Sequence, residues 1–248
     1  MQSAPPKVSI ITVCYNAERF IERTVLSVIN QTYSNVEYII IDGNSKDKTV
    51  ELIKKYQSKV SRFTSEPDQG IYDAMNKGLR AATGDYVWFI NAGDCIYNER
   101  TLENIMKQAN NEDFIYGQAE RVDENGNTRG WHKKTPSAEE LSAKSFLNGM
   151  VICHQSMLVK RVIAPEFNTS WMIANDIDWA IRIMMRTKSR KYLDFFFCRF
   201  LDGGASADKR MKALKERFII SKKYFGLLPT LLAHVKIGVQ ALRRGSIS

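Results

Sequence analysis

Apolar residues follow two alternating patterns along the first half of the chain. Three nearly continuous apolar runs predict strands buried on both faces, at residues 7–16, 36–41 and 86–90. Three segments with apolar residues at every third or fourth position predict helices, at residues 20–28, 50–56 and 70–83. Asn16 is a candidate N-cap for the first of them, and residues 60–65 are expected to add a short strand. This alternation predicts an α/β fold with a mostly parallel central sheet and flanking helices.

The second half of the chain is less regular. Its pattern predicts strands at residues 114–116, 118–123, 128–132, 150–160 and 192–198. Asn125-Gly126 is a hairpin turn signal, and residues 175–186 are expected to form a helix. Because the chain shows neither an internal repeat nor an interdomain linker, residues 1–208 are interpreted as a single domain.

Polar residues stand at the carboxyl ends of the three buried strands, as Tyr15-Asn16, Asp42-Gly43 and Asn91 to Asp94. Ligands of parallel α/β sheets bind beyond the carboxyl ends of the strands, so these residues predict one binding site. Carboxylates there suit a hard metal ion or a ligand rich in hydroxyl and N–H donors. The chain has neither a G-x-x-x-x-G-K-[ST] loop nor a strand-linked G-x-G-x-x-G, which disfavours P-loop and dinucleotide-binding proteins.

Composition and charge narrow the class of protein. With 44% hydrophobic and 25% charged residues, the 248-residue chain is of average globular composition, which excludes collagen-like and mostly disordered chains. The net charge is +9, and residues 209–248 alone carry ten basic residues and one acid, so residues 1–208 are neutral. No nucleic-acid partner is therefore expected, because such proteins carry a basic face on the folded body.

Cysteines and the N-terminus suggest a compartment. Cys14, Cys95, Cys153 and Cys198 form no C-x-x-C pair and have no metal-ligand spacing. The first residues, MQSAPPKVS, lack the charged-then-apolar pattern of a signal peptide. We expect reduced thiols and a cytoplasmic protein.

Four motifs together resemble family 2 glycosyltransferases, which are nucleotide-sugar enzymes of the GT-A fold, and more narrowly the bacterial exopolysaccharide transferases of the colanic-acid type. These motifs are V-S-I-I-T-V-C-Y-N at 8–16, D-G-N-S-K-D-K-T at 42–49, S-E-P-D-Q-G-I-Y-D-A-M-N-K-G at 65–78 and G-D-Y-V-W-F-I-N-A-G-D at 84–94. Weaker matches are H-Q-S at 154–156, N-D-I-D-W at 175–179 and the turn at 202–204. The resemblance implies a catalytic domain at 1–208, with a nucleotide-sugar-binding half at about 7–116 and an acceptor-binding half at about 117–208.

The resemblance also implies how the donor, a nucleoside-diphosphate sugar of the UDP type, is held. Tyr15 and Asp42 would hold the base, with Asp42 accepting a hydrogen bond from a uracil N–H. Asp68 and Asn76 would lie near the ribose and the diphosphate. Met75 stands where many relatives place a phosphate-binding arginine, and Lys77 is a candidate substitute.

Asn91–Asp94 takes the place of the family's D-x-D-type metal motif. Asp94 matches the carboxylate that binds Mn²⁺ or Mg²⁺, and Asn91 and Gly93 stand where many relatives carry further acids. With one acid instead of two or three, the affinity for the metal is expected to depend on the donor's phosphates.

Asp176 matches the aspartate that takes the proton from the acceptor hydroxyl, which makes the predicted reaction an inverting transfer. Asp176 and Asp178 are about 200° apart around a helix, so only one of them can face the acceptor. An ionised base is required, and strong apolar burial of Asp176 would argue against this role.

Each candidate also has a purely structural interpretation. Asp42 could end its strand in an Asx-turn, Asp94 could cap the next segment, and Asp176 and Asp178 could stabilise the positive end of their helix. Tyr15 could be a plain core aromatic, and His154 could be a hydrogen-bonded strand histidine.

Residues 209–248 form a basic tail that is expected to be helical and amphipathic. Met211, Leu214 and Phe218 fall on one side, and Pro229 interrupts a later apolar stretch that is too short to span a bilayer. A basic amphipathic helix predicts docking to an anionic membrane surface, here the inner face of the cell membrane. The alternative is a helix packed on the body of the protein or on a partner subunit.

The predicted function is sugar transfer from a nucleotide-diphosphate sugar to a saccharide or lipid-linked oligosaccharide in surface polysaccharide synthesis. Two alternatives stay open: a sugar nucleotidyltransferase, and a non-catalytic basic module that binds membranes or nucleic acid. The first would need a glycine- and arginine-rich phosphate loop, which V-C-Y-N-A-E-R does not provide.

Overall fold

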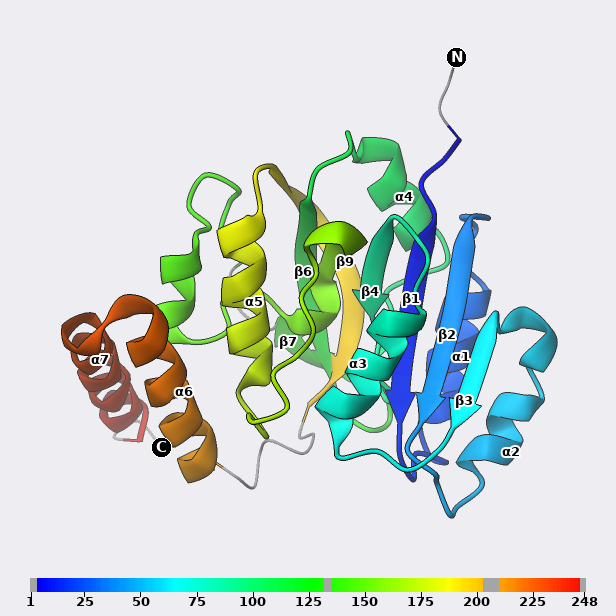
Figure 1. Ribbon diagram of the computed structural model, residues 1–248, viewed down its shortest axis with the longest axis horizontal. Helices are drawn as coiled ribbons and strands as arrows, with labels where there is room; N and C mark the ends of the chain where they lie inside the picture. The colour runs from blue at the N-terminus through cyan, green and yellow to red at the C-terminus, as the bar shows by residue number, and fades with distance from the viewer. Residues whose placement is uncertain (1–3, 132–134, 203–209, 246–248) are drawn as a thin grey trace.

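The computed structural model describes residues 4–131, 135–202 and 210–245 (Figure 1). Nine strands form one sheet in the order β3-β2-β1-β4-β8-β6-β9-β5, and β7 pairs with β6 outside this path. The strands are β1 (Val8–Cys14), β2 (Val36–Asp42), β3 (Arg62–Ser65), β4 (Tyr86–Phe89), β5 (Cys95–Ile96), β6 (Phe114–Val122), β7 (Thr128–Trp131), β8 (Met157–Lys160) and β9 (Arg190–Leu201).

Helices cover both faces of the sheet, so the fold has three layers (Figure 1). Buried apolar residues form two clusters, one for each face of the sheet. One cluster joins the sheet to α3 (Ile71–Ala81), α5 (Asn175–Arg186) and α6 (Arg210–Phe225). The other joins it to α1 (Ile21–Ile29), α2 (Thr49–Lys54) and α4 (Thr101–Gln108). Alternate residues of β1 fall in different clusters, as expected for a strand buried on both faces.

The described residues also form 3₁₀ turns at Gln57–Lys59, Ala143–Asn148, His154–Ser156 and Arg161–Ile163, and a further helix, α7 (Leu227–Gly245). Among the helices of the described residues, none combines the length and the apolar character that crossing a bilayer requires. Pro229 does not break α7, because it lies in the first turn, where its missing N–H would have no helical partner.

The predicted α/β class is confirmed, and the sheet is parallel only in part. β1 pairs in parallel with β2 and β4, and β2 with β3, as the pattern of the first half indicates. In the second half β8 runs antiparallel to both β4 and β6, so the complete sheet is mixed. The two strands expected at 114–116 and 118–123 are one strand, β6.

Two local expectations are corrected. The strand expected at 150–160 begins only at Met157, because the N–H and the hydroxyl of Ser156 both bond to the carbonyl of Cys153 and close a turn there. Asn16 does not cap α1. Its backbone has a positive φ of 47°, and its side-chain oxygen accepts a hydrogen bond from the N–H of Lys46.

Parallel pairing brings the polar loops to one edge of the sheet. The N–H of Gly43 donates to the carbonyl of Cys14, and the N–H of Ala92 donates to the carbonyl of Val13. The loops after β2 and β4 therefore lie on either side of the end of β1, about 10 Å apart by the spacing of neighbouring strands. Helices α3 and α5 begin at this same edge, the lower one in Figure 1.

Candidate active site

Asp42 ends β2 and organises the loop that follows. Its side chain is fully buried, and its carboxylate accepts hydrogen bonds from four donors of Cys14, Ser45 and Ser65. The bond from the N–H of Ser45 closes an Asx-type turn. A contact with a nucleotide base would have to displace one of these donors, so that role of Asp42 stays a prediction.

Tyr15, Gly43 and Asp68 lie together beside this loop. A Cβ atom at position 43 would fall 2.4 Å from Oδ2 of Asp68 and 3.3 Å from a ring carbon of Tyr15, so only glycine allows this approach. The Tyr15 side chain is 62% exposed, which leaves its ring free to stack against a flat ligand. Asp68 accepts a hydrogen bond from the N–H of Gly70 at the start of α3. The structure thus brings Tyr15 and Asp68 together next to the Asp42 loop.

The turn at residues 91–94 is held in place by α1. Gly93 has a φ of +104°, its N–H donates to Oγ1 of Thr24 (3.0 Å), and its carbonyl accepts from Arg23 (2.8 Å). Thr24 also donates its hydroxyl hydrogen to the carbonyl of Asp94 (2.7 Å). A side chain at position 93 would strain the backbone and meet Leu201 at 3.1 Å. Gly93 therefore shapes the turn that presents Asp94.

Asp94 is buried between this turn and β9. One carboxylate oxygen accepts from the N–H of Leu201 (3.0 Å) and the other from the side-chain amide of Gln155 (2.8 Å). Burial raises the pKa of Asp94 to about 7, although these two bonds and the nearby Arg23 act in the opposite direction. A bound cation would favour the ionised form of this carboxyl.

The 91–94 turn suits a metal ion that takes most of its ligands from a substrate. The side-chain oxygen of Asn91 is buried and has no hydrogen-bond partner among the described residues. An amide oxygen and a carboxylate in one turn are oxygen ligands of the kind that Mg²⁺ accepts, with water and phosphate completing its shell. Within residues 4–131, 135–202 and 210–245, no group of three His, Cys, Asp or Glu side chains could hold a metal by itself.

Asn76 and Lys77 of α3 both have partners within the protein. The Asn76 amide is 3% exposed and exchanges two hydrogen bonds with the backbone of Phe167. It fastens α3 to the segment before α5, and its place near the ribose and the diphosphate stays a prediction. Lys77 donates to the carbonyl of Pro67 (2.7 Å) and pairs with Glu66 (2.8 Å), so its charge is already partly neutralised.

The H-Q-S motif contributes a glutamine rather than a histidine to the site. His154 is packed among the rings of Phe89, Phe167 and Trp179, and burial lowers its pKa to about 4, so it is neutral at pH 7. Gln155 is the member of the motif that reaches Asp94. His154 is thus a side chain packed among aromatic rings.

Asp176 and Asp178 point in different directions, as their helical spacing requires. Asp178 is fully buried and bonds to Arg182 (2.7 Å) and to the hydroxyl of Tyr224 (2.8 Å), so it joins α5 to α6. Asp176 is only partly buried. Burial raises its pKa to about 6, against the hydrogen bond from the N–H of Ile177 and the charge of Arg217. It is therefore about nine-tenths ionised at pH 7.

A cavity of about 360 Å³ opens beside Asp176. Its other lining residues are Ile173, Ala174, Ile177, Ala213, Leu214 and Arg217. Of the described residues that the sequence places at the donor, none lines this cavity. The hydroxyl of Tyr72 in α3 donates to the carbonyl of Ile173 (2.8 Å), which fixes the start of α5 at the carboxyl edge of the sheet. Asp176 therefore shares that edge with Asp42 and Asp94 and has a cavity of its own.

Sequence reasoning missed Glu216 and Arg217 of α6. The Glu216 carboxylate accepts hydrogen bonds from the backbone N–H groups of Met172, Ile173 and Ala174, the residues just before α5. Arg217 lines the cavity, and its charge acts on the pKa of Asp176. The available signal was that Glu216 is the single acid of the basic segment 209–248.

Solved structures show the class of fold. Staphylococcus aureus TarS 1–349 in complex with UDP-GlcNAc superposes with a TM-score of 0.73 at 17% identity, over 93% of this chain and 73% of that one. The mannosyltransferase PcManGT from Pyrobaculum calidifontis, in complex with GDP-Man and Mn²⁺, gives a TM-score of 0.64 at 17% identity, over 99% and 81%. The protein thus has the GT-A type of α/β fold.

Sequence comparison shows the family. The model of glycosyl transferase family 2 matches residues 9–166, so the chain belongs to glycosyltransferase family 2. An uncharacterised glycosyltransferase of Haemophilus influenzae is 41% identical over 98 residues, which are 38% of this chain and 39% of that protein. A PGL/p-HBAD biosynthesis glycosyltransferase of Mycobacterium bovis is 28% identical over 189 residues, 72% of this chain and 70% of that protein. The chain thus aligns with only about two fifths of the Haemophilus protein.

Replacing Glu216 by Gln should destabilise the protein at neutral pH. Burial alone would raise the pKa of Glu216, but the three N–H donors outweigh it and hold the pKa below its usual value. The stabilisation is therefore present at neutral pH and is lost as the pH falls through the lowered pKa. We expect Glu216→Gln to cost about 2 kcal/mol at pH 7 and less at pH 4, measured by urea unfolding.

Glu166→Gln is the matched control, since Glu166 is half exposed and pairs with Arg80 across the surface, where about 0–1 kcal/mol is expected. Equal losses in the two variants would contradict the anchoring role of Glu216.

Proposed function

We propose that this protein is an inverting glycosyltransferase that moves a sugar from a nucleoside-diphosphate sugar of the UDP type to a saccharide or lipid-linked acceptor. One observation carries the proposal: in a family 2 chain, α5, whose first turn carries the partly exposed Asp176, begins at the edge of the sheet where the loop after β4 carries Asp94. Synthesis of a surface polysaccharide is the proposed context.

The donor would lie along the carboxyl edge between the Asp42 loop and the 91–94 turn. The exposed Tyr15 ring offers a surface for the base, and Asp68 beside it offers an acceptor for ribose hydroxyls. The diphosphate would reach Asn91 and Asp94, about two strand spacings away. A bound Mn²⁺ or Mg²⁺ supplies positive charge to the diphosphate that leaves. The UDP-GlcNAc and GDP-Man complexes of the two similar structures support a nucleotide-sugar donor.

Asp176 would take the proton from the acceptor hydroxyl. A hydroxyl is a weak nucleophile, and a positioned carboxylate that removes its proton as it attacks the anomeric carbon lowers the barrier. The acceptor oxygen forms the new bond on one face of the sugar while the bond to the diphosphate breaks on the other, so the anomeric centre is inverted. A pKa of about 6 leaves Asp176 both ionised and basic enough at neutral pH.

The cavity beside Asp176 favours an acceptor with an apolar part and an anionic group. Ile173, Ile177 and Leu214 supply apolar walls, and the Arg217 guanidinium, whose Nε has no hydrogen-bond partner among the described residues, supplies a cation. A lipid linked to a saccharide through phosphate has both features. These side chains support the lipid-linked alternative among the acceptors.

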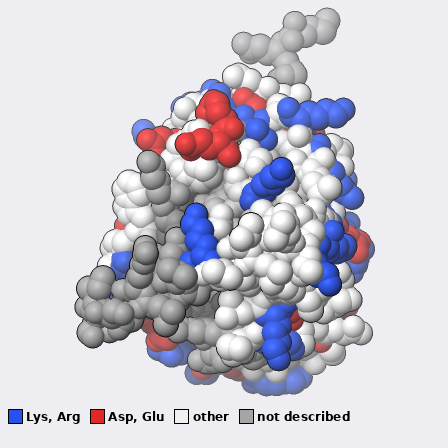
Figure 2. Space-filling view, turned by 90° about the vertical axis from the view of Figure 1, so that its left-hand side faces the viewer, with Lys and Arg blue, Asp and Glu red and all other residues white. Residues whose placement is uncertain are grey.

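The helices of residues 210–245 would bring the protein to its acceptor. On α7, five apolar side chains are between 44% and 69% exposed: Leu227, Leu228, Leu231, Leu232 and Val235. In Figure 2, which faces the side of the molecule that carries α6 and α7, separate Lys and Arg side chains stand out from uncharged surface. Apolar side chains that enter a bilayer between lysines favour an anionic membrane surface. We propose a peripheral protein on the cytoplasmic face of the membrane, with residues 1–208 as the catalytic domain and 209–248 as the docking segment.

Asp176→Asn should abolish sugar transfer and leave donor binding intact, because the amide cannot accept the proton. Transfer is measured with a panel of UDP- and GDP-sugars, and binding is measured as thermal stabilisation by UDP and Mn²⁺. Asp178→Asn is the control, since its carboxylate bonds to Arg182 and Tyr224 inside the protein. It should lower stability while keeping transfer in the folded fraction. Full activity of Asp176→Asn would refute the assignment of the base.

Asp94→Ala should remove the response to Mn²⁺. For the wild type we expect thermal stabilisation by Mn²⁺ and UDP together that is much larger than by either alone, because the 91–94 turn offers few ligands itself. The affinity should fall about tenfold per pH unit below 7, since protonation of Asp94 competes with the cation. Asp85→Ala, which changes an acid bonded to the N–H of Lys7 at the other edge, is the control. An unchanged response in Asp94→Ala would contradict the metal assignment.

The double variant Leu228→Glu/Leu232→Glu should release the protein from anionic vesicles. Binding is measured by co-sedimentation with phosphatidylglycerol–phosphatidylcholine vesicles and with phosphatidylcholine alone. Val162→Glu places a charge at another highly exposed apolar position, outside α7, and should bind as the wild type does. Membrane docking through α7 would be ruled out if the double variant sedimented normally.

A further inference from the structure

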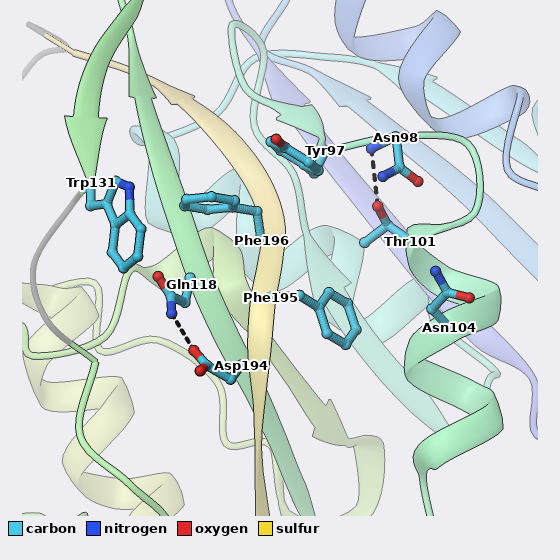
Figure 3. Close-up of a pocket in the computed structure, with 9 residues that line it drawn as sticks. All are labelled: Tyr97, Asn98, Thr101, Asn104, Gln118, Trp131, Asp194, Phe195 and Phe196. Atoms are coloured by element: carbon cyan, nitrogen blue, oxygen red, sulfur yellow. Dashed lines mark hydrogen bonds between the residues drawn. The ribbon is translucent and has the colours of Figure 1, made fainter.

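A second cleft, of about 410 Å³, is lined by residues of β6, β7 and β9, of α4 and of the turn before α4. Figure 3 shows it between β7, β9 and the start of α4, with Trp131, Phe196 and Tyr97 around it and Gln118 and Asp194 on its floor. It shares no lining residue with the cavity beside Asp176. The two cavities are therefore separate.

An irregular stretch of β9 builds the cleft. Tyr116 pairs with Tyr192 and Gln118 pairs with Phe196, so β9 advances four residues where β6 advances two. Such a bulge redirects side chains, and Asp194, Phe195 and Phe196 all line the cleft in succession. Gly117 makes this possible, since a Cβ there would fall 2.3 Å from the ring of Phe197. Regular pairing of β6 with β9 is thus interrupted at the point where the cleft forms.

Four aromatic rings line the cleft, those of Tyr97, Trp131, Phe195 and Phe196. The ring centroids of Tyr97 and Phe196 are 5.1 Å apart, and Trp131 meets Phe196 edge-on at 5.2 Å. The Arg199 guanidinium lies 4.7 Å from the Tyr97 centroid and helps to fix that ring. Trp131 is nevertheless 57% exposed. An ordered tryptophan left open beside two other rings is a surface for a ligand with a flat apolar face.

Not every buried polar atom in the cleft has a hydrogen-bond partner among the described residues. Gln118 is 9% exposed, and its amide nitrogen donates to Asp194 and to the hydroxyl of Tyr192 (3.0 Å). Its side-chain oxygen is buried and has no hydrogen-bond partner among the described residues. Buried polar atoms normally have a hydrogen-bond partner, so a ligand that donates a hydrogen bond to this oxygen would satisfy it. The hydroxyl of Tyr192 also donates to Asp194 (2.7 Å), which keeps that carboxylate in place as a second acceptor.

The charge of the cleft disfavours a phosphate ligand. Among the lining residues that the structure describes there is one acid, Asp194, and neither lysine nor arginine. Hydroxyl groups that donate to a carboxylate and an amide oxygen, combined with an apolar ring face that stacks on an aromatic side chain, describe a sugar. A saccharide has both features and needs no charge.

We propose that this cleft binds a neutral oligosaccharide, outside the site of transfer. The inference rests on the proposed function for the source of the saccharide, which would be a part of the acceptor or product chain distant from the reacting end. Tyr97 follows Asp94 by three residues through β5, so a chain in the cleft lies close to the 91–94 turn. Binding there would hold a growing chain near the enzyme between transfers.

The test is calorimetric titration of the full-length protein with four neutral probes: cellopentaose, maltopentaose, laminaripentaose and chitopentaose. At least one should bind in the millimolar range, and its affinity should not change when salt is raised. Trp131→Ala should weaken that binding about tenfold, the effect expected from losing one stacking ring. Asp194→Asn should weaken it as well.

Met185→Ala removes a 66% exposed apolar side chain of α5 that does not line the cleft, and should leave pentaose binding unchanged. The proposal is overturned if none of the four probes binds at millimolar concentration, or if Trp131→Ala binds the pentaose as tightly as the wild type does. Titration with UDP and Mn²⁺ is run in parallel. Loss of that signal alone would count against the proposed function and not against the saccharide cleft.

Discussion

Parallel pairing of β1 with both of its neighbours is the constraint on which the proposed active site depends. In a parallel arrangement all carboxyl ends fall on one side, so the loops after β1, β2 and β4 must meet at one edge. Each loop is then tightened locally: Asp42 by four donors, the 91–94 turn by Thr24 and Arg23 of α1. Carboxylates far apart in sequence come together because of strand direction.

The second half of the chain contributes to the same edge through the end of β9 and the start of α5. β8 runs antiparallel beside β4, and the sheet continues into β6 and β9, whose end supplies the N–H of Leu201 to Asp94. Helix α5 begins at the same edge and places Asp176 on the other face of the sheet. Asp94 and Asp176 thus approach this edge from different layers.

Local patterns in the sequence predicted the first half of the fold closely and the second half only in part. Buried parallel strands such as residues 36–41 leave an unmistakable apolar run, and the acids after them mark the edge. By contrast, the turn at His154–Ser156 depends on Ser156 bonding to Cys153, and the irregular β9 depends on its register with β6. Register and reversed strand direction are long-range properties, so a pattern read along the chain does not contain them.

Candidate site residues divide in the same way. The motifs named Asp94 as a candidate, and the helical spacing separated Asp176 from Asp178. They could not show that the Asn76 amide is bonded to Phe167. Nor could they show that Glu216, forty residues after Asp176, holds the segment before α5. These contacts join segments that are distant in sequence.

Glu216 also links α6 to the segment that precedes α5. Its carboxylate accepts hydrogen bonds from three consecutive backbone N–H groups just before Asp176. The same helix is followed directly by α7 with its exposed leucines. Any displacement of α6 and α7 is transmitted through Glu216 to the backbone just before Asp176. In the proposed function, attachment to a membrane and the alignment of the proton acceptor are therefore coupled, and exchanging these helices between relatives would change both at once.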